Sequence, residues 1–403
     1  MKILRIIARL NVGGPARHVV WLTERLNDEE FESVLIAGTV PKGEESMNYV
    51  AADHGVTPIF IEEMSRELSP KDAISLIKIF REIRRYKPDI IHTHTAKAGT
   101  VGRTAALLYK LVTPGTGNLR IVHTFHGHVF HSYYGKFKTG IFIAIEKFLA
   151  RFATDKIITI SPQQFHEIHE EVGIGRHDQF EVVPLGIDVG VFEQTDEIRR
   201  AIRDEIGVNE NDVLVGFVGR LTEIKDISLY LNTAAEVYKN DASSPIRFAI
   251  VGDGHLRNRL EAEAAELGIA DRVTFLGNRT DVENVYSALD IVALTSLNEG
   301  TPLSLIEAMA ARRPVISTVV GGVRDLLGDI VEEKEGFRVC ERGIGVPDRS
   351  VSGYTKGLLY LVENGRLRKS LAEKGRAFVE AQYSKDRLVD DIAKVYRSLI
   401  GKV

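Results

Sequence analysis

Short apolar runs alternate with longer amphipathic stretches along almost the whole chain of 403 residues. Apolar runs of this kind are typical of buried strands, whereas apolar residues spaced three or four apart are typical of helices with one buried face. The alternation therefore predicts a mostly parallel sheet that is covered by helices on both faces. In the first half, the predicted strands are residues 3–10, 31–38, 57–62, 89–95, 120–126, 156–161 and 180–184.

A second series of strands and helices follows in the second half. Its predicted strands lie within residues 212–220, 246–254, 272–277, 290–296 and 313–320, and from residue 350 onward the pattern is helical. The longest predicted helix of the first half lies within "SPKDAISLIKIFREIRRYKPD". It opens on Ser69 and Pro70 and stops before Pro88, as helix start and stop signals require.

The length predicts two domains, because a single core stops growing at roughly 250–300 residues. We place the boundary after Gly186, where an apolar strand gives way to the polar segment "DVGVFEQTDE". The predicted domains are residues 1–186 and 187–385, and we expect the final helix, about 386–403, to pack on the first domain. Open parallel sheets bind ligands beyond the carboxyl ends of their strands, so we expect the site in the loops there, at a cleft that the domains share.

Composition excludes several classes of protein. Hydrophobic residues make up 44% and charged residues 27%, and no apolar run approaches the roughly 20 residues of a membrane-spanning helix. Arg5 and Arg9 interrupt the apolar start of the chain, which is typical of a first strand rather than a signal peptide. The single cysteine, Cys340, excludes an internal disulfide and a cysteine-based metal cluster. With so little cysteine, we expect a cytoplasmic protein. The net charge of -4 argues against a nucleic-acid partner.

Two of the predicted loops have features that suit phosphate groups. "RLNVGGPARHV" places Gly13 and Gly14 before a helix, where backbone amides can approach an anion; a tight turn between strand and helix is the alternative. "FVGRLTEIKD" places Arg220 and Lys225 after a strand, where a bidentate guanidinium and a point charge suit a diphosphate. A solvated loop with incidental charges is the alternative for this pair. In "IVGDGHLRNRLEAEA" we favour a tight turn as the role of both glycines.

Histidines gather at two further strand ends. The segment "VHTFHGHVFHSYYG" contains His123, His126, His128 and His131. A metal site is one interpretation, but no nearby carboxylate or cysteine completes a ligand set, so we predict no metal and assign His126 to hydrogen bonding. The segment "IIHTHTAKAGTVGR" presents His94 and Lys97 in the same way.

The segment "EGTPLSLIEA", residues 299–308, places two acids on either side of a predicted helix start. Thr301 is expected to be the N-cap and Pro302 to lie in the first turn, with Glu299 in the preceding loop and Glu307 within the helix. Two acids at a strand end are typical of a ligand site. The alternative is a capping box between Ser304 and Glu307, which needs no ligand.

Together these segments resemble the retaining glycosyltransferases of the GT-B fold, in particular glycosyltransferase family 4. "EGTPLSLIEAMAARRPVISTVVGGVRDLL" resembles the E-x7-E signature of that family and "FVGRLTEIKD" its Arg-x4-Lys pair, while "NVGG", "PLGID", "VGDG" and "VTFLG" occur in the expected order. The resemblance spans nearly the whole chain and implies two doubly wound domains that face a cleft. Gly300, Thr301 and Pro302 replace the Phe-Gly of many relatives, which puts the backbone contacts to the sugar in doubt.

The resemblance implies a role for each matching residue. Arg220 and Lys225 would bind the donor diphosphate, Glu299 would face the donor sugar, and His126 would lie beside the sugar ring. The implied donor-binding residues are Gly14, Glu307, Leu303, Ser304, Asn278 and Arg279, of which Glu307 would bind the ribose. His94 and Lys97 would belong to the acceptor side.

The implied activity is retaining transfer of a sugar from a nucleotide diphosphate sugar, UDP-linked by expectation. The acceptor would be a glycan, a lipid-linked molecule or a small molecule in the synthesis of polysaccharide or glycoconjugate. No cofactor is expected, because the basic pair can replace a divalent cation. A nucleotide-sugar 2-epimerase or hydrolase is the alternative reaction, and a nucleotide-sugar binding protein is the non-enzymatic one.

Two basic and apolar segments are typical of a peripheral membrane contact. Arg81, Arg84, Arg85 and Lys87 gather at one helix end, and "KFKTGIFIAIEKFLARF" joins basic residues to a broad apolar surface. Such a contact would place the protein on the inner face of the membrane. The alternative is that most of these apolar residues belong to the core.

Overall fold

The computed structural model describes residues 1–11, 14–40, 46–64, 70–126, 136–193 and 195–401. The chain forms two compact units. Unit 1 comprises Met1–Gly186 and Lys385–Val403, and unit 2 comprises Ile187–Ser384. The chain therefore passes into unit 2 after Gly186 and returns to unit 1 with its last helix.

Unit 1 is built on a parallel sheet of seven strands in the order β3-β2-β1-β4-β5-β6-β7. The strands are β1 (Lys2–Ile7), β2 (Glu32–Gly38), β3 (Ile59–Ile61), β4 (Ile90–His94), β5 (Arg120–Thr124), β6 (Lys156–Thr159) and β7 (Phe180–Val182). Each predicted strand overlaps one of them, but most predictions run too far at the carboxyl end. Leu10, Phe125 and Ile160 are buried there in loops, so the apolar pattern continues after the ladder ends.

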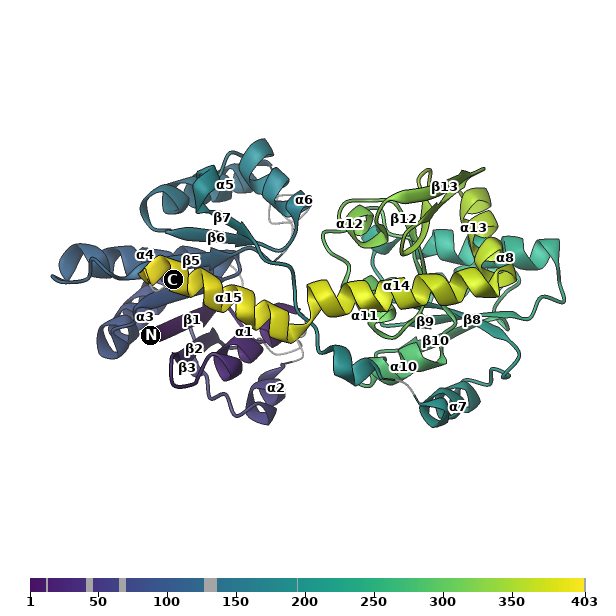
Figure 1. Cartoon of the computed structure of the whole chain (residues 1–403), viewed down its shortest axis with the longest axis horizontal. Coiled ribbons are helices and arrows are strands. Elements are labelled where there is room, and N and C mark those ends of the chain that lie inside the picture. The colour runs from purple at the N-terminus through teal and green to yellow at the C-terminus, as the bar shows by residue number, and fades with distance from the viewer. Residues whose placement is uncertain (12–13, 41–45, 65–69, 127–135, 194, 402–403) are drawn as a thin grey trace. The chain divides into compact units, whose positions relative to one another are not determined.

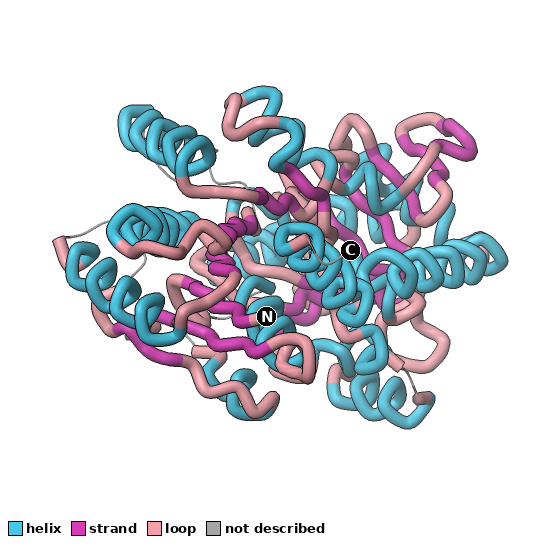
Figure 2. The backbone as a smooth tube through the Cα atoms, turned by 60° about the vertical axis from the view of Figure 1, so that its left-hand side comes forward, coloured by secondary structure: helices cyan, strands magenta, loops and turns pink. Residues whose placement is uncertain are grey.

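Helices cover both faces of this sheet (Figure 2). They are α1 (Gly14–Arg25), α2 (Asn48–Asp53), α3 (Asp72–Tyr86), α4 (Ala96–Val112), α5 (Lys136–Phe152), α6 (Pro162–Phe165), η1 (His166–Glu171), η2 (His177–Gln179) and α15 (Lys385–Ile400). Apolar residues of α3 and α4 form one core with β1 and β4, and those of α1 form another with the opposite sides of β1 and β2. Helix α3 ends at Tyr86, and its C-cap, Lys87, has a left-handed conformation directly before Pro88.

The final helix, α15, is part of unit 1 although it is the last element of the chain (Figure 1). Leu388, Ile392 and Tyr396 are buried against β1 and α1, where Ile3 and Leu22 belong to the same core. Burying one such apolar side chain contributes about 1.5–3 kcal/mol, so this helix is a structural part of unit 1 and not a free tail.

Unit 2 is built on an eight-stranded sheet in the order β10-β9-β8-β11-β12-β15-β14-β13. The strands are β8 (Val213–Val218), β9 (Ile246–Val251), β10 (Val273–Gly277), β11 (Ile291–Leu294), β12 (Val315–Thr318), β13 (Ile330–Lys334), β14 (Phe337–Cys340) and β15 (Gly343–Val346). The last three were not predicted. β13 and β14 pair in antiparallel fashion, and β13 is exposed at the sheet edge, so "IVEEK" lacks the apolar run that marks the buried strands.

The helices of unit 2 also lie on both faces of its sheet (Figure 2). They are η3 (Val189–Phe192), α7 (Asp196–Glu205), η4 (Glu223–Lys225), α8 (Ile227–Asn240), α9 (Arg257–Glu266), α10 (Val282–Ala288), α11 (Leu303–Ala310), α12 (Val323–Leu327), α13 (Val351–Glu363) and α14 (Gly365–Tyr383). The prediction of two doubly wound domains is confirmed. None of the described helices of either unit combines the length and apolar character that a membrane crossing requires.

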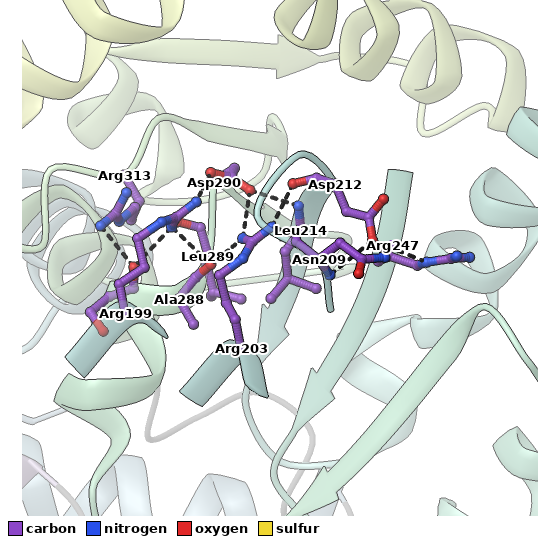
Figure 3. Close-up of polar contacts among 11 residues, drawn as sticks. Arg199, Arg203, Asn209, Asp212, Leu214, Arg247, Ala288, Leu289, Asp290 and Arg313 are labelled. Carbon is purple, nitrogen blue, oxygen red and sulfur yellow. Dashed lines mark hydrogen bonds and ion pairs between the residues drawn. The ribbon is translucent and has the colours of Figure 1, made fainter. Parts of the chain in front are cut away.

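Helix α7 is held to the sheet of unit 2 by a network of arginines around Asp290 (Figure 3). Asp290 accepts from Arg199 at 2.6 Å, from Arg203 at 3.1 Å and from the amide of Leu214 at 2.8 Å. Arg203 is fully buried and also donates to the carbonyls of Ala288, Asn209 and Asp212. The Nη atoms of Arg199 and Arg203 donate to acceptors within the protein, so the network is structural.

Replacing Asp290 by Asn should destabilise unit 2. The change keeps the volume but leaves the buried Arg203 without its counter-charge, so the free energy of unfolding should fall by about 3 kcal/mol. Urea denaturation followed by circular dichroism measures this. Glu335→Gln is the matched control, because Glu335 pairs with Lys356 on the surface and should change stability by less than about 0.5 kcal/mol. Equal stability of the two variants would contradict the role of Asp290.

Candidate active site

An ion pair joins two loops at the carboxyl end of the sheet in unit 2. Lys225 Nζ lies 2.5 Å from Glu299 Oε1, and the two side chains are only 18% and 11% exposed. Ser296 Oγ donates to the same carboxylate oxygen at 2.6 Å, and Thr295 Oγ1 donates to the Lys225 carbonyl at 2.9 Å. Two of the predicted site residues therefore meet directly. Ser296, which sequence reasoning missed, lies three residues before Glu299 and helps to hold it.

The loop that carries Arg220 is held by the Gly-Asp-Gly turn after β9. The amide of Leu221 donates to Asp253 O at 3.0 Å. A Cβ atom on Gly252 would lie 2.1 Å from Gly219 O, and one on Gly254 would lie 2.3 Å from Leu221 O. Only glycine allows backbones to approach so closely, so the turn supports the loop that presents the exposed Arg220 side chain.

The loop of Glu299 is held in a similar way by Gly321 and Gly322, which follow β12. A Cβ atom on Gly321 would lie 1.9 Å from Glu299 O, and one on Gly322 would lie 1.8 Å from Gly300 O. The amide of Gly322 also donates to Glu299 O at 3.1 Å. No role was predicted for this pair of glycines. Their position directly after a predicted strand is the signal that identifies them.

Helix α11 begins differently from the prediction. Its N-cap is Pro302, with no side-chain capping bond, so the assignment of Thr301 as N-cap is wrong. Ser304 is the second helical residue and not a cap, which also contradicts the capping box of Ser304 and Glu307. The extended backbone at Pro302 moves the helix start one residue beyond the expected one. The amides of Leu303 and Ser304 are thus the first of the helix, where backbone N–H groups lack intrahelical partners.

Glu307 contacts a buried tyrosine. Tyr286 Oη lies 3.1 Å from Glu307 Oε2 and 3.1 Å from Ser304 O. Burial, and then the charge of Glu307, raise the pKa of Tyr286, so the neutral phenol can donate to the carboxylate. Tyr286 was not predicted, because it lies 21 positions before Glu307 and only the packing of α10 on α11 brings them together.

Arg279 is the other charged residue that was predicted to bind the sugar donor. Two carboxylates pair with its guanidinium. Its Nε and Nη2 donate to Asp281 at 2.8 Å each, and Nη1 also pairs with Glu205. These hydrogen bonds raise the pKa of Arg279. The guanidinium thus anchors the loop after β10, in which the neighbouring Asn278 is exposed.

The predicted residues of unit 1 lie at the carboxyl ends of β4 and β5. His94 is buried at the end of β4, and its Nδ1 lies 2.9 Å from Nε2 of His126, which follows β5. Thr95 has φ +71° and ψ 155°, a conformation that costs about 1–3 kcal/mol outside glycine. The buried Lys97 is paired with Asp72 of α3. Strain of this kind persists where the surrounding structure imposes it, often at functional sites.

Other predictions for unit 1 have mixed outcomes. Gly14 is the first residue of α1, so the helix begins one residue earlier than predicted. Gly13, His128 and His131 lie outside the described residues. His123 is buried in β5, where its Nδ1 lies 2.8 Å from Thr93 Oγ1. His18 of α1, which was not singled out, lies beside His94 and His126 with ring centroids 5.5 and 4.8 Å away.

Two family models match the chain in succession. Residues 12–191 match the model described as Glycosyltransferase Family 4, and residues 198–378 match the model described as Glycosyl transferases group 1. The chain therefore belongs to the family 4 glycosyltransferases of the GT-B fold, which confirms the resemblance drawn from the sequence.

Individual proteins agree with this assignment. The chain is 29% identical to the UDP-Gal:alpha-D-GlcNAc-diphosphoundecaprenol alpha-1,3-galactosyltransferase of Escherichia coli, over 71% of this chain and 72% of that protein. The crystal structure of Anabaena HepE in complex with UDP has a TM-score of 0.79 at 20% identity and covers 99% of this chain and 100% of that one. Sucrose-phosphate synthase of Thermosynechococcus elongatus has a TM-score of 0.77 at 21% identity, with full coverage of both chains. These structures support the GT-B fold.

Acid should destabilise unit 1. Burial is the main cause that lowers the pKa values of His18, His92, His94 and His123. These rings stay neutral when folded but take up protons on unfolding below about pH 6.5, so stability is present above that pH and falls as the pH drops. Each ring contributes about 1.4 kcal/mol per pH unit below 6.5.

The only tryptophan, Trp21, lies in α1 and reports on unit 1. Its fluorescence should show a lower urea midpoint at pH 5.5 than at pH 7. In His18→Leu, one ring fewer takes up a proton on unfolding, so the difference between the two midpoints should be smaller. Identical midpoints at the two pH values would contradict neutral buried histidines.

Proposed function

We propose that the protein is a retaining, metal-independent glycosyltransferase that uses a UDP-sugar. The observation that carries the proposal is the cluster in unit 2 of an exposed arginine, Arg220, with the Lys225–Glu299 ion pair. A diphosphate leaving group gains negative charge as the glycosidic bond breaks, and preorganised cations stabilise that charge. Arg220 and Lys225 supply two such cations, with the first amides of α11 as further donors.

The two acids have different partners, which supports different roles. Glu299 is held by Lys225 and Ser296. When the donor binds, Lys225 turns to the phosphates, and the carboxylate of Glu299 becomes available to orient the sugar hydroxyls. Because Glu299 is assigned to the sugar hydroxyls, no carboxylate is assigned the role of nucleophile, and we propose attack on the same face from which the phosphate leaves. Glu307, oriented by Tyr286, accepts hydrogen bonds from the ribose. Asn278 lies in the loop that receives the base, and Arg279 braces that loop.

The acceptor binds to unit 1, where the uncharged ring of His94 lies on the acceptor side, whereas Gly14 is assigned to the donor. His126 lies beside the donor sugar, and Lys97, tied to Asp72, shapes the acceptor side. The Escherichia coli relative acts on a diphosphoundecaprenol-linked sugar, which supports a lipid-linked acceptor. Ile141, Phe148 and Phe152 of α5 are exposed, and they support a peripheral contact with the inner face of the membrane.

The alternative of a nucleotide-sugar 2-epimerase or hydrolase has less support, because the relative named above is a transferase. The complete set of cations and acids argues against a protein that only binds nucleotide sugars.

Donor consumption tests the proposal. A panel of UDP- and GDP-sugars should be incubated with the protein, with and without diphosphoprenyl-linked and free sugars as acceptors, and release of nucleotide should be followed. We expect UDP release that depends on the acceptor, without added metal and in the presence of EDTA, and an unchanged anomeric configuration by NMR. Equal consumption of donor without an acceptor, or an epimerised donor, would support the alternative instead.

The two acids should separate in binding experiments. Glu307→Gln should weaken UDP and the UDP-sugar about tenfold to hundredfold, because a hydrogen bond to a charged group contributes about 1.5–3 kcal/mol. Glu299→Gln should leave UDP binding nearly unchanged and slow the transfer step. Titration calorimetry with UDP and steady-state transfer rates measure both effects.

Tyr286→Phe should weaken UDP less than Glu307→Gln does, because it removes one of the groups that orient Glu307. Tyr230→Phe is the matched control, since Tyr230 is buried and its hydroxyl donates to the carbonyls of Val215 and Ala249, not to a predicted site residue. Loss of UDP affinity in Tyr230→Phe, or none in Glu307→Gln, would contradict the ribose assignment.

A further inference from the structure

Three histidines of unit 1 converge from three elements. His18 lies in α1, His94 ends β4, and His126 follows β5. One ring nitrogen from each lies within 4.8 Å of the other two. His18 and His94 are buried, and His126 is partly covered. Among the described residues, no other group of three potential metal ligands lies so close together.

The hydrogen bonds of these rings are incomplete. Among the described residues, both ring nitrogens of His18, Nε2 of His94 and Nδ1 of His126 are buried without a hydrogen-bond partner. A buried polar group without a partner costs about 1–3 kcal/mol. His18 is the extreme case, since neither of its ring nitrogens is bonded, whereas His94 and His126 contact each other through their remaining nitrogens. The nearby His92 differs, because its two nitrogens lie 2.7 Å from Tyr396 Oη and from Thr124 Oγ1.

We propose that His18, His94 and His126 form a binding site for a borderline transition-metal ion such as Zn²⁺. Neutral imidazole is the preferred nitrogen ligand of Zn²⁺, and three histidines are one of its known ligand sets, with a fourth position open to water or another ligand. The ligand set contains no carboxylate, so Mg²⁺ and Ca²⁺, which require oxygen ligands, do not fit it.

The geometry needs only a small adjustment. Nitrogens around a tetrahedral Zn²⁺ lie about 3.3 Å apart at Zn–N distances of about 2.0–2.1 Å. His94 Nδ1 and His126 Nε2 are 2.9 Å apart, so a bound ion would separate these two slightly and draw His18 toward them. Burial lowers the pKa of His126 to about 3, so it does not need to lose a proton at neutral pH.

One charge opposes the ion. Arg5 is fully buried in the same region, and its positive charge repels a cation bound among these rings. We therefore expect Zn²⁺ to bind more weakly than at structural zinc sites. The site is thus suited to reversible occupation.

Occupation would have a consequence for transfer that rests on the proposed function. An ion bound by His126 removes the ring nitrogen that is proposed to face the donor sugar. Zn²⁺ should therefore inhibit transfer, and EDTA should restore it. This ion is distinct from the divalent cation that other transferases use to bind a diphosphate, since its ligands lie in unit 1 and the proposed diphosphate cations in unit 2.

Metal binding is measured on the full chain with Zn²⁺ and Co²⁺. We expect one ion per chain by native mass spectrometry, visible absorption of Co²⁺ with three nitrogen ligands, and no comparable binding of Mg²⁺. His18→Leu should weaken Zn²⁺ more than about tenfold, because it removes a direct ligand. It should fold, since a leucine replaces a buried ring without hydrogen bonds. His126→Ala, at a partly exposed position, is the second variant.

His166→Ala is the matched control, because His166 forms a surface pair with Glu170 at 2.6 Å that is the plainest alternative site. It should bind Zn²⁺ like the parent. Unchanged affinity in both His18→Leu and His126→Ala, or loss only in His166→Ala, would overturn the proposed site. Binding without inhibition of transfer would support the metal site and contradict the role of His126, so the two proposals fail separately.

Discussion

The candidate site of unit 2 depends on backbones that approach one another too closely for a side chain. The backbone of Gly252 and Gly254 packs directly against the loop of Arg220, and that of Gly321 and Gly322 packs against the loop of Glu299. Both loops are thereby held in place at the carboxyl end of the second sheet. Without this backbone support, the flexible side chains of Lys225 and Glu299 would lose more conformational freedom on meeting, as the partners of an exposed ion pair do, and such pairs contribute little stability.

The arginines of unit 2 differ in whether a carboxylate pairs with them. Arg203 is buried, and its Nη1 and Nη2 atoms donate to Asp290 and to backbone carbonyls, which fastens α7 to the sheet. Arg279 is bound by Asp281 and Glu205. Arg220 is exposed at a strand end, and no carboxylate of the described residues pairs with it. A cation presented in this way is the one that an incoming anion can bind.

The two units offer different chemistry. Unit 2 presents cations and acids, which suit a nucleotide diphosphate, whereas the carboxyl ends of β4 and β5 in unit 1 present neutral rings. Burial keeps these rings neutral, so they can donate and accept hydrogen bonds from hydroxyl groups, or bind a transition metal through lone pairs. The same physical cause, desolvation, underlies the acid sensitivity expected of unit 1 and the metal site proposed there.

The sequence by itself determined the alternation of strands and helices, the two doubly wound units and the family, because periodicity and the spacing of glycines, acids and cations are local properties. It placed Arg220, Lys225 and Glu299 in loops after strands, and Glu307 in the helix that follows, for the same reason. It misjudged the start of α11 and missed β13, β14 and β15, whose polar or short segments are strands only because a neighbour provides hydrogen bonds. Tertiary structure alone decided that Tyr286 meets Glu307 and that His18 joins His94 and His126, because those contacts join residues far apart in the chain through packing that no local pattern encodes.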